Sequence, residues 1–512
     1  MSIWLHSPVQ YHGLTQTLTI VFSFPELALT WTWILSEALY FEIGSFWTLF
    51  YLLFEWSIRV IMLVIVPFRR SPDAAKGWLL LVFILPVPAL VLYILIGRPN
   101  YPRWRRIRFA RLRTILEGAA HQLSRLQACR PPILPSNLIQ AATLIKNLGQ
   151  FPTLAGNNAE LLSDYNGVID RLIADIDGAQ DHVHLVVYIF ADDDTGRRVI
   201  KALVGAVRRG VTCRVLIDAL GSRQWAHRVL EALTAGGVTA HLVLPLGLIR
   251  RRTARADLRN HRKIFVIDSR IAYAGSQNIV DANMTNVELV ARVTGPVVLE
   301  LQAVFAADWF LETEQVLDIA NLFPHHHPGS GMVAQVLPSG PDYPTAGVSH
   351  LMVGLIHGAR ERVVITTPYF IPDEALLRAL QTAVLRGVEV HLVVSRQVDQ
   401  ILVGFAQRSY YEELLEAGIR IHLYRSRLLH AKHFSIDSEI TQIGSSNVDI
   451  RSFLLNAEVN LIFYDRDVTA RIRLEQEGYF ASSDLLTLPL WRGRFVGIKV
   501  CENLARLMSP LL

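Results

Sequence analysis

Two long apolar stretches near the amino terminus stand out from the mixed hydrophobic and polar pattern of the rest of the chain. Residues 43–68 and 77–96 are each long enough for a helix across a hydrocarbon core of about 30 Å, which takes about 20 residues. In the first stretch, Glu55 and Arg59 are spaced to neutralise each other on a helix. In the second, Pro86 should introduce a kink. The pattern predicts a transmembrane hairpin of two helices over residues 43–97.

The flanks of this hairpin differ in charge. Seven arginines lie between residues 98 and 113, whereas the connecting loop holds Arg69, Arg70 and Lys76. The positive-inside rule therefore predicts that the chain after the hairpin is cytoplasmic. Residues 1–42 are also apolar, but they lack the basic start and the cleavage site of a signal peptide. An interfacial segment and an additional span both fit them.

Beyond residue 146, short apolar strands alternate with amphipathic helices, and the order occurs twice. The predicted elements are helices over 168–179 and 348–359 and strands over 182–190, 211–218, 363–367 and 388–394. Such alternation is typical of α/β layers. We expect two tandem α/β/α sandwich domains, at 146–330 and 331–512, related by pseudo-twofold symmetry. Residues 98–145 form a basic connector before them.

Each repeat contains the same set of polar residues. The sequences HRKIFVIDSRIAYAGSQN from His261 and HAKHFSIDSEITQIGSSN from His430 place His, Lys, Asp, Ser and Asn at equal offsets. One His-x-Lys pair can arise by chance, but a doubled set of five matched positions is a specific signal. The members are His261, Lys263, Asp268, Ser276 and Asn278 in the first copy and His430, Lys432, Asp437, Ser445 and Asn447 in the second. Two half-sites are implied.

Strand geometry assigns these side chains different directions. Residues two positions apart share a face, so the His and the Lys of each copy can reach one phosphate. The Asp stands at an odd offset, and we therefore interpret Asp268 and Asp437 as structural carboxylates that pair with a basic or backbone group. Gly275 and Gly444 are expected to open tight turns that bring the Ser and Asn side chains to an anion.

Two further acids occupy matched positions. Glu288 and Glu458 follow the histidines of their own copies at nearly equal distances. A carboxylate on Nδ1 fixes the tautomer of an imidazole and stabilises its protonated form. We expect Glu288 to orient His261 and Glu458 to orient His430.

Three other features were considered for function. Arg250, Arg251, Arg252, Arg255 and Arg259 precede the first histidine, where a solvated loop and a grip on anionic headgroups fit equally well. His325, His326 and His327 are adjacent in a loop with neither Cys nor acid nearby, which argues against a zinc site. The three scattered cysteines form neither a disulfide framework nor a metal knuckle.

Composition adds little to this picture. The 512 residues leave room for more than one domain, and the hydrophobic content of 51% agrees with membrane segments. A net charge of +5 fits anionic lipid surfaces and nucleic acid equally.

The paired motifs at 261–268 and 430–437 resemble the HKD motifs of the phospholipase D superfamily. Together with RRSPDAAKGWLLL at 69–81, QVLPSGPD at 335–342 and TTPYFIPD at 366–373, they make the chain similar to bacterial cardiolipin synthases. Val186 and Glu288 depart from the family pattern, which usually has Glu and Asp at these positions. The HKD residues themselves are present in both copies.

The resemblance implies a phosphatidyltransferase of the cytoplasmic (inner) membrane, with several spans. It would move the phosphatidyl group of one phosphatidylglycerol to another, giving cardiolipin and glycerol through a phosphohistidine. By the same resemblance His261 is the nucleophile and His430 the general acid and base, while the lysines, serines and asparagines of the motifs hold the phosphate. No cofactor, metal or nucleic acid is implied.

Three alternatives remain open from the sequence. A phospholipase D or transphosphatidylase could use phosphatidylethanolamine, a free alcohol or water as acceptor. A nuclease of the same superfamily would share the two motifs but would not need a membrane hairpin. A non-catalytic scaffold would be expected to have lost a His or Lys, and neither copy has.

Overall fold

The computed structural model describes residues 24–70, 72–97, 104–112, 132, 134–245, 257–317, 322, 331–343 and 346–507. The chain divides into two compact units. One contains the chain up to Phe68 together with Leu79–Leu90, and the other contains Arg69–Trp78 and Val91–Leu512. Each unit is described by itself.

The amino-terminal region is helical. Helix α1 runs from Phe24 to Arg69, and its part from Phe46 to Arg69 is the one helix in the described residues that is long and apolar enough to cross a membrane. The Glu55 carboxylate lies 3.1 Å from the Arg59 guanidinium, so the two charges neutralise each other as expected. The earlier part of the predicted segment 1–42 lies outside the described residues up to position 23.

The second predicted span differs from expectation. It forms two short helices, α2 (Pro72–Ile84) and α3 (Pro86–Ile96), which meet at Leu85. Proline has no backbone N–H to donate, and its ring is tolerated in the first turn of a helix, so a new helix starts at Pro86. The structure thus contains one clear apolar spanning helix, followed by two shorter apolar helices, rather than a clear two-helix hairpin.

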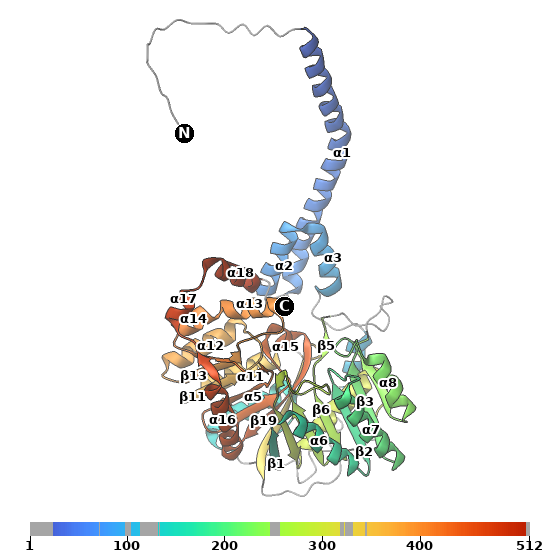
Figure 1. The fold of residues 1–512 in the computed structure, drawn as a ribbon, viewed down its shortest axis with the longest axis vertical. Coiled ribbons are helices and arrows are strands. Elements are labelled where there is room, and N and C mark those ends of the chain that lie inside the picture. Colours follow the sequence, from blue (N-terminus) through green and yellow to red (C-terminus); the bar gives the residue numbers. More distant parts are fainter. Residues whose placement is uncertain are drawn as a thin grey trace, which may run out of the picture. The chain divides into compact units, whose positions relative to one another are not determined.

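A single mixed β-sheet joins both halves of the repeat (Figure 1). The halves meet where β1 (Leu154–Leu162) pairs antiparallel with β10 (Met332–Ser339). Outward from this pair, the first half contains β9 (Val290–Thr294), β7 (Ile271–Gly275), β6 (Ile264–Ile267), β2 (His182–Val187), β3 (Thr212–Asp218) and β4 (Thr239–Val243). The second half contains β19 (Asn456–Tyr464), β17 (Ile440–Gly444), β16 (His433–Ile436), β11 (Arg362–Thr366), β13 (Glu389–Ser395), β14 (Arg420–Tyr424) and β20 (Ser483–Leu485). Apart from β20, the same strand order occurs on both sides of β1 and β10.

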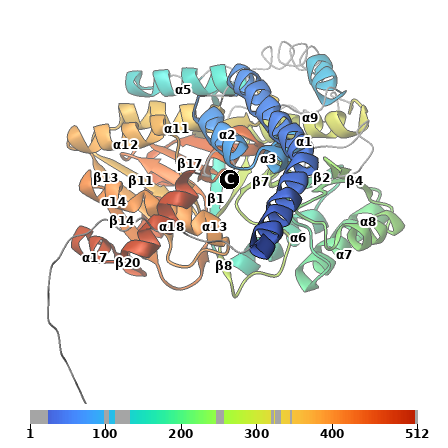
Figure 2. The same ribbon diagram turned by 90° about the horizontal axis from the view of Figure 1, so that it is seen from above.

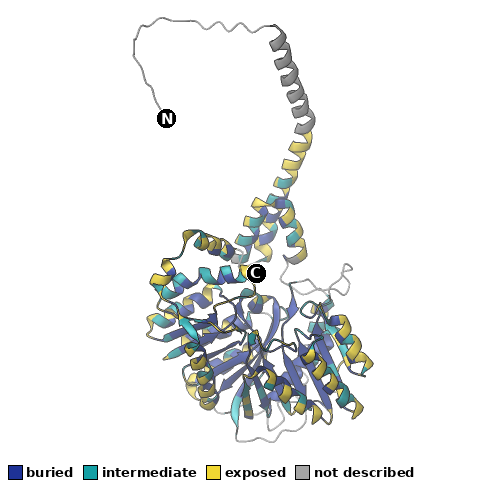
Figure 3. Ribbon diagram, in the orientation of Figure 1, coloured by how far each residue is buried: buried dark blue, intermediate teal, exposed yellow. Residues whose placement is uncertain are grey.

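Helices cover both faces of the sheet. The parallel strands β2, β3 and β4 are connected by α7 (Asp194–Arg208) and α8 (Ala226–Ala235), and α6 (Tyr165–Asp177) precedes them. Every residue of β2 is buried, as expected for a parallel strand covered on both faces. Buried strands between partly exposed helices are visible in Figure 3.

The second half repeats this arrangement. Helices α11 (Gly347–Gly358) and α12 (Glu374–Leu385) connect or precede its parallel strands, and α5 (Ser136–Gly149) lies beside α11 (Figure 2). Helices α9 (Val297–Thr313) and α16 (Arg466–Ala481) pack on the sheet in the two halves. The two α/β regions predicted from the repeat are therefore present, and they share one sheet.

One buried ion cluster ties the predicted connector to the first half. Arg105, in the helical segment 104–112, is fully buried and pairs with Glu312 of α9. Its Nε also lies 3.4 Å from a carboxylate oxygen of Asp342. Burial raises the pKa of Asp342 to about 6, although Arg105 opposes the shift.

Candidate active site

Two very short parallel strand pairs bring the catalytic motifs of the two halves together. In the first pair, β5 (Arg259–Asn260), directly before His261, lies alongside Asn456 and Ala457 of β19. In the second, β15 (Leu428–Leu429), directly before His430, lies alongside β8 (Asn286–Val287). Each histidine is therefore fixed against a strand of the other half.

Backbone hydrogen bonds also connect each histidine to the opposite half. The His261 N–H donates to the carbonyl of Ala457, and the His430 N–H donates to the carbonyl of Val287, each at 2.8 Å. The next residue in each accepting strand is a glutamate. The strand pairs thus deliver each histidine directly to a carboxylate of the opposite half.

The glutamates accordingly pair with the histidines in a crossed manner. Nδ1 of His261 lies 3.0 and 3.1 Å from the carboxylate oxygens of Glu458, and Nδ1 of His430 lies 2.7 Å from Oε1 of Glu288. The predicted pairing within each copy is therefore wrong, although both acids do contact an imidazole Nδ1. Both contacts leave the Nε2 atoms as the reactive nitrogens.

Burial sets the protonation of these pairs. Removal from water lowers the pKa of His261 to about 4, against the opposing effect of Glu458, and it also lowers the pKa of His430. Burial alone would raise the pKa of Glu288, but His430 and Lys432 bring it down to about 2. The pKa of Glu458 is lowered likewise, by His261 and Lys263. Both acids are therefore ionised near pH 7.

The two lysines are buried within the same site. Lys263 Nζ donates to the carbonyl of His261 at 2.7 Å, and Lys432 Nζ donates to the carbonyl of His430 at 2.6 Å. Burial lowers the pKa of Lys263 to about 7 and that of Lys432 to about 8. Across the halves, Lys263 also lowers the pKa of His430, and Lys432 lowers the pKa of His261. The site therefore concentrates positive charge where an anion would bind.

The site also contains an aromatic side chain, Tyr188, that the sequence analysis did not single out. The Tyr188 ring lies edge to face with His261, with centroids 4.8 Å apart, and Lys263 Nζ lies 5.3 Å from the Tyr188 centroid. Tyr188 directly follows the buried strand β2, which is the one signal in the sequence that could have marked it.

The motif aspartates lie at the other end of their strands. Asp268 and Asp437 occupy the turns after β6 and β16, with φ of 52° and 49°, a region that Asp tolerates better than most residues. The Asp268 carboxylate accepts the backbone N–H groups of 180–182, and Asp437 accepts those of 360–362. These are structural contacts to backbone groups, away from the histidines.

The motif serines contact the segments that carry the glutamates. Ser445 donates its hydroxyl to the Glu458 carboxylate and accepts the Val459 N–H at 3.0 Å. Ser276 accepts the Leu289 N–H, also at 3.0 Å, and is likewise fully buried. Phosphate binding by these two serines stays a prediction.

The adjacent glycines also act differently from expectation. Neither Gly275 nor Gly444 has a positive φ. A Cβ at Gly275 would lie 2.4 Å from the Leu289 carbonyl oxygen, and one at Gly444 would lie 2.5 Å from the Val459 carbonyl oxygen. Each glycine therefore permits close approach of the strand that carries the glutamate rather than opening a turn.

The two asparagines remain close to the site. Asn278 Oδ1 accepts the backbone N–H of Ile189 at 3.1 Å, which fixes the side-chain amide. Asn447 is buried, and its Oδ1 has no hydrogen-bond partner among the described residues. This oxygen can therefore accept a hydrogen bond from a donor group of a ligand.

A layer of buried charges supports the His261 segment. Arg262 donates through Nε to the Glu458 carbonyl at 3.0 Å and pairs with Asp308 of α9. Asn260 donates to the same Asp308 at 3.0 Å. The sequence analysis missed Arg262 and Asp308, although the Arg between His261 and Lys263 was a visible signal.

Two predicted clusters can now be placed. Arg259 is buried and lies 3.4 Å from a carboxylate oxygen of Asp218, so it belongs to the interior rather than to an open loop. The other four arginines of that stretch, and the histidines at 325–327, lie outside the described residues. Within the described residues, no group of three or more His, Cys, Asp or Glu side chains is arranged to hold a metal.

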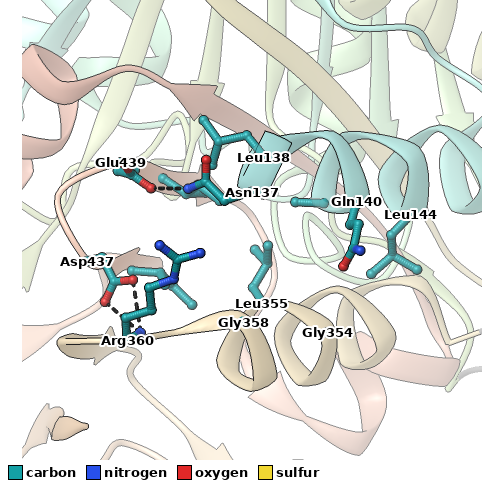
Figure 4. A pocket seen from close by; sticks show the side chains of 13 residues that line it. Asn137, Leu138, Gln140, Leu144, Gly354, Leu355, Gly358, Arg360, Asp437 and Glu439 are labelled. Atoms are coloured by element: carbon teal, nitrogen blue, oxygen red, sulfur yellow. Dashed lines mark hydrogen bonds between the residues drawn. The ribbon is translucent and has the colours of Figure 1, made fainter. Parts of the chain in front are cut away.

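A pocket elsewhere in the second half is separate from this chemistry (Figure 4). It encloses about 220 Å³ between α5 and α11, with Leu138, Leu144 and Leu355 among its lining residues. Asp437 also lines it, and Asp437 follows β16 whereas His430 precedes that strand. The pocket therefore lies at the end of the strand remote from the histidines.

Comparisons with known proteins agree with the motifs. A family model described as "Cardiolipin synthase, PLD-like domain" matches residues 172–309 and 352–478. A cardiolipin synthase A of Pectobacterium atrosepticum is 34% identical over 461 residues, covering 87% of this chain and 94% of that protein. A cardiolipin synthase A of Salmonella arizonae is 33% identical over 493 residues, covering 91% of this chain and 100% of its own length.

One solved structure resembles the fold. The crystal structure of a phosphatidylserine synthase from Haemophilus influenzae superposes with a TM-score of 0.56 and covers 73% of this chain and 100% of its own. Its sequence identity is 15%, so this likeness concerns the fold alone.

Proposed function

Because the chain belongs to the cardiolipin synthase family of the phospholipase D superfamily and is a phosphatidyltransferase, we propose that it transfers the phosphatidyl group between two phosphatidylglycerol molecules. The products are cardiolipin and glycerol. The observation that carries this proposal is the crossed arrangement, in which His261 with Glu458 and His430 with Glu288 form two complete units across the halves. Two such units supply a nucleophile and a separate proton carrier.

In the first half-reaction, Nε2 of His261 attacks the phosphorus of one phosphatidylglycerol. The bond between phosphorus and the headgroup glycerol oxygen breaks. His430, protonated on both ring nitrogens and stabilised in that form by Glu288, donates its Nε2 proton to this oxygen. Glu458 stabilises the positive charge that develops on the His261 ring through Nδ1. The assignment of His261 as nucleophile follows the family resemblance, since burial lowers the pKa of both histidines.

In the second half-reaction, His430 takes the proton from a headgroup hydroxyl of the second phosphatidylglycerol. That oxygen attacks phosphorus, the bond between phosphorus and His261 breaks, and cardiolipin forms. Glu288 holds His430 through Nδ1 during both proton transfers.

Phosphate charge is held by the buried polar groups of the site. We assign this role to Lys263, Lys432, Asn278 and Asn447, which come in matched pairs from the two halves. Fixed positive groups in a buried site stabilise developing charge strongly, because few water molecules screen them. The proposed steps need no metal.

Membrane attachment serves the lipid substrate. The apolar helix from Phe46 to Arg69 is suited to anchor the chain in a bilayer. We propose further that α2 and α3 return through the membrane to complete a hairpin over 43–97, that the membrane is the inner one, and that the catalytic halves at 146–330 and 331–512 are cytoplasmic. The arginines at 98–113 support that sidedness.

The acceptor is an alcohol rather than water. A phosphohistidine exposed to water would hydrolyse, whereas an acceptor that is held in place gains an effective concentration of about 10⁵ M or more. A second phospholipid in the same bilayer satisfies this condition. The test uses vesicles of pure phosphatidylglycerol, with lipid products measured by mass spectrometry.

We expect cardiolipin and free glycerol as the main products and phosphatidate as a minor one. Phosphatidate as the dominant product, at every phosphatidylglycerol density tried, would assign the chain to hydrolysis and contradict the proposal. Vesicles that also contain phosphatidylethanolamine would show whether a second acceptor competes.

A further inference from the structure

The carboxyl-terminal helix α18 (Val496–Leu507) presents an apolar stripe to solvent. Val496, Val500, Leu504 and Leu507 are between 51% and 69% exposed. Their spacing of four, four and three residues places them on one side of a helix. A row of large apolar side chains that faces outward is not explained by the folding of the helix itself.

The opposite side of α18 fixes its orientation. Glu502 and Ala505 are buried, and the Glu502 carboxylate lies 3.1 Å from Arg408 of α13 (Ile401–Ser409) and 2.7 Å from Arg494. A buried carboxylate with two arginine partners is costly to expose. The helix is therefore held with its apolar stripe outward.

Charges beside the stripe are balanced within the protein. Arg492 and Lys499 lie 3.3 and 3.2 Å from carboxylate oxygens of Glu412. Arg506 lies 3.1 Å from Glu413. A partner of this surface is consequently bound by its apolar groups more than by its charge.

Helix α13 connects α18 to the catalytic site. Its first residues, Ile401 and Leu402, are exposed, with Ile401 at 77%. Just before them, Asp399 accepts the Tyr369 hydroxyl at 2.7 Å and lies near enough to Lys432 to interact with its charge. Exposed apolar residues therefore stand at the start of α13, beside Asp399, and α13 packs against α18.

An apolar residue also flanks the site on the side of the other half. Met284 is 83% exposed in the loop before β8, and the neighbouring Thr285 carbonyl accepts the Leu428 N–H at 2.8 Å. Leu428 lies two residues before His430. An exposed apolar side chain thus stands beside the segment that leads to His430.

We propose that α18 and the start of α13 form a docking surface that lies in the interface of a phospholipid bilayer and sets the catalytic site against it. The inference rests on the proposed lipid substrate. It commits to a bilayer because α13, whose exposed start lies beside the site that takes lipid, packs against α18, and because the apolar stripe of α18 has the form of an interfacial helix.

The depth of α18 can be measured in the full chain. Cys501 is an exposed residue of α18, whereas Cys213 is buried and burial raises the pKa of its thiol to about 12. A Cys129→Ser variant, labelled at Cys501 with an environment-sensitive fluorophore and reconstituted into phosphatidylglycerol vesicles, reports on this helix. We expect quenching by nitroxide-bearing lipids that changes little between low and high salt, because the nearby cations are paired. Quenching by aqueous iodide alone would overturn the proposal.

Activity separates docking from catalysis. A Val500→Ser/Leu504→Ser variant should lose about tenfold in turnover on vesicles, since less apolar surface is buried in the bilayer. Its activity on a short-chain, monomeric phosphatidylglycerol should be unchanged. The matched control is Asn503→Ser, a polar exchange on the same exposed helix, which should leave both activities unchanged.

The remaining outcomes are decisive. An equal loss on both substrates would mean that the stripe supports the fold and would overturn the proposal. Loss of a chemically cross-linked dimer in the variant, without any lipid quenching in the parent, would assign the surface to a second copy of the chain and overturn it too. Absence of transfer by the parent protein on either substrate would instead refute the proposed function, whatever the depth of α18.

Discussion

The crossed pairing of acids and histidines makes a sharp prediction about Glu458. Replacing it by Gln keeps the size of the side chain and removes the charge that faces His261 Nδ1 at 3.0 Å. An amide can also present its NH₂ group to Nδ1, which would place the ring proton on Nε2, the attacking atom. The change therefore weakens the nucleophile in two ways without opening a cavity.

The expected loss of rate follows from two effects, the lost charge and the changed tautomer. A hydrogen bond to a charged group contributes about 1.5–3 kcal/mol. Since about 1.4 kcal/mol corresponds to a factor of ten in rate, loss of the charge alone slows attack by about 10- to 150-fold. A change of tautomer slows the reaction further. In the serine protease triad, the comparable exchange of Asp for Asn lowers kcat about 10⁴-fold. We expect Glu458→Gln to fall between these limits.

The assay uses a phosphatidyl ester of p-nitrophenol. This leaving group departs without a proton, so the burst of nitrophenol reports formation of the phosphohistidine and does not need the general acid. Glu458→Gln and His261→Ala should both lose the burst. Glu288→Gln and His430→Ala should keep the burst and lose only the later transfer to phosphatidylglycerol.

The two alanine variants calibrate the experiment, because they identify the nucleophile directly. If His430 proves to be the nucleophile, Glu288→Gln should lose the burst and Glu458→Gln should keep it, and the crossed pairing still holds. A burst that disappears with the glutamate of the same half as the nucleophile would refute the reasoning.

Four further outcomes are expected. With a soluble short-chain substrate, kcat/KM should rise as pH passes about 4, where His261 loses its proton. It should fall at higher pH, first as His430, whose pKa is lowered by burial, loses the proton that it donates, and again as pH passes about 7, where Lys263 loses its charge; a profile flat to pH 9 would contradict this. EDTA should leave that activity unchanged, and a loss restored by zinc would argue for a metal. Gly444→Ala should reduce turnover about 100-fold by displacing the adjacent strand, whereas Gly478→Ala, where a Cβ meets no atom within 4 Å, should not. Arg105→Met should lower the free energy of unfolding by about 3–5 kcal/mol in denaturant titrations, because two buried carboxylates lose their partner, and an unchanged midpoint would show that the pair is dispensable.

Local patterns allowed much of the fold to be predicted. The strands Thr212–Asp218, Arg362–Thr366 and Glu389–Ser395 lie within one residue of the predicted bounds 211–218, 363–367 and 388–394, since each is a short apolar run between polar residues. The second membrane span was predicted less well. Its composition is apolar throughout, but the helix restarts at Pro86, and hydrophobicity alone does not carry that information.

The details of the site depended on contacts between distant residues. Glu288 and Glu458 stand at nearly equal distances after the histidines of their own copies, but these offsets do not show whether the contacts form within a copy or across the two copies. Ser445 could reach a phosphate or a carboxylate, and its contact with the carboxylate depends on the approach of β19. The same approach explains Gly444, where the space for a Cβ rather than the backbone angle is limiting.

The strand exchange at β5 and β15 also bears on how such a chain could have arisen. In a symmetric homodimer of one half, the histidine of each subunit would contact the glutamate of the other subunit. The twofold axis would make these two contacts identical. Fusion of two such subunits into one chain would retain both contacts and would allow the two copies to differ in sequence. Once the copies are independent, one histidine can specialise for attack and the other for proton transfer. On this view, the crossed contacts are the remnant of an ancestral subunit interface, and the division of labour between the histidines came later.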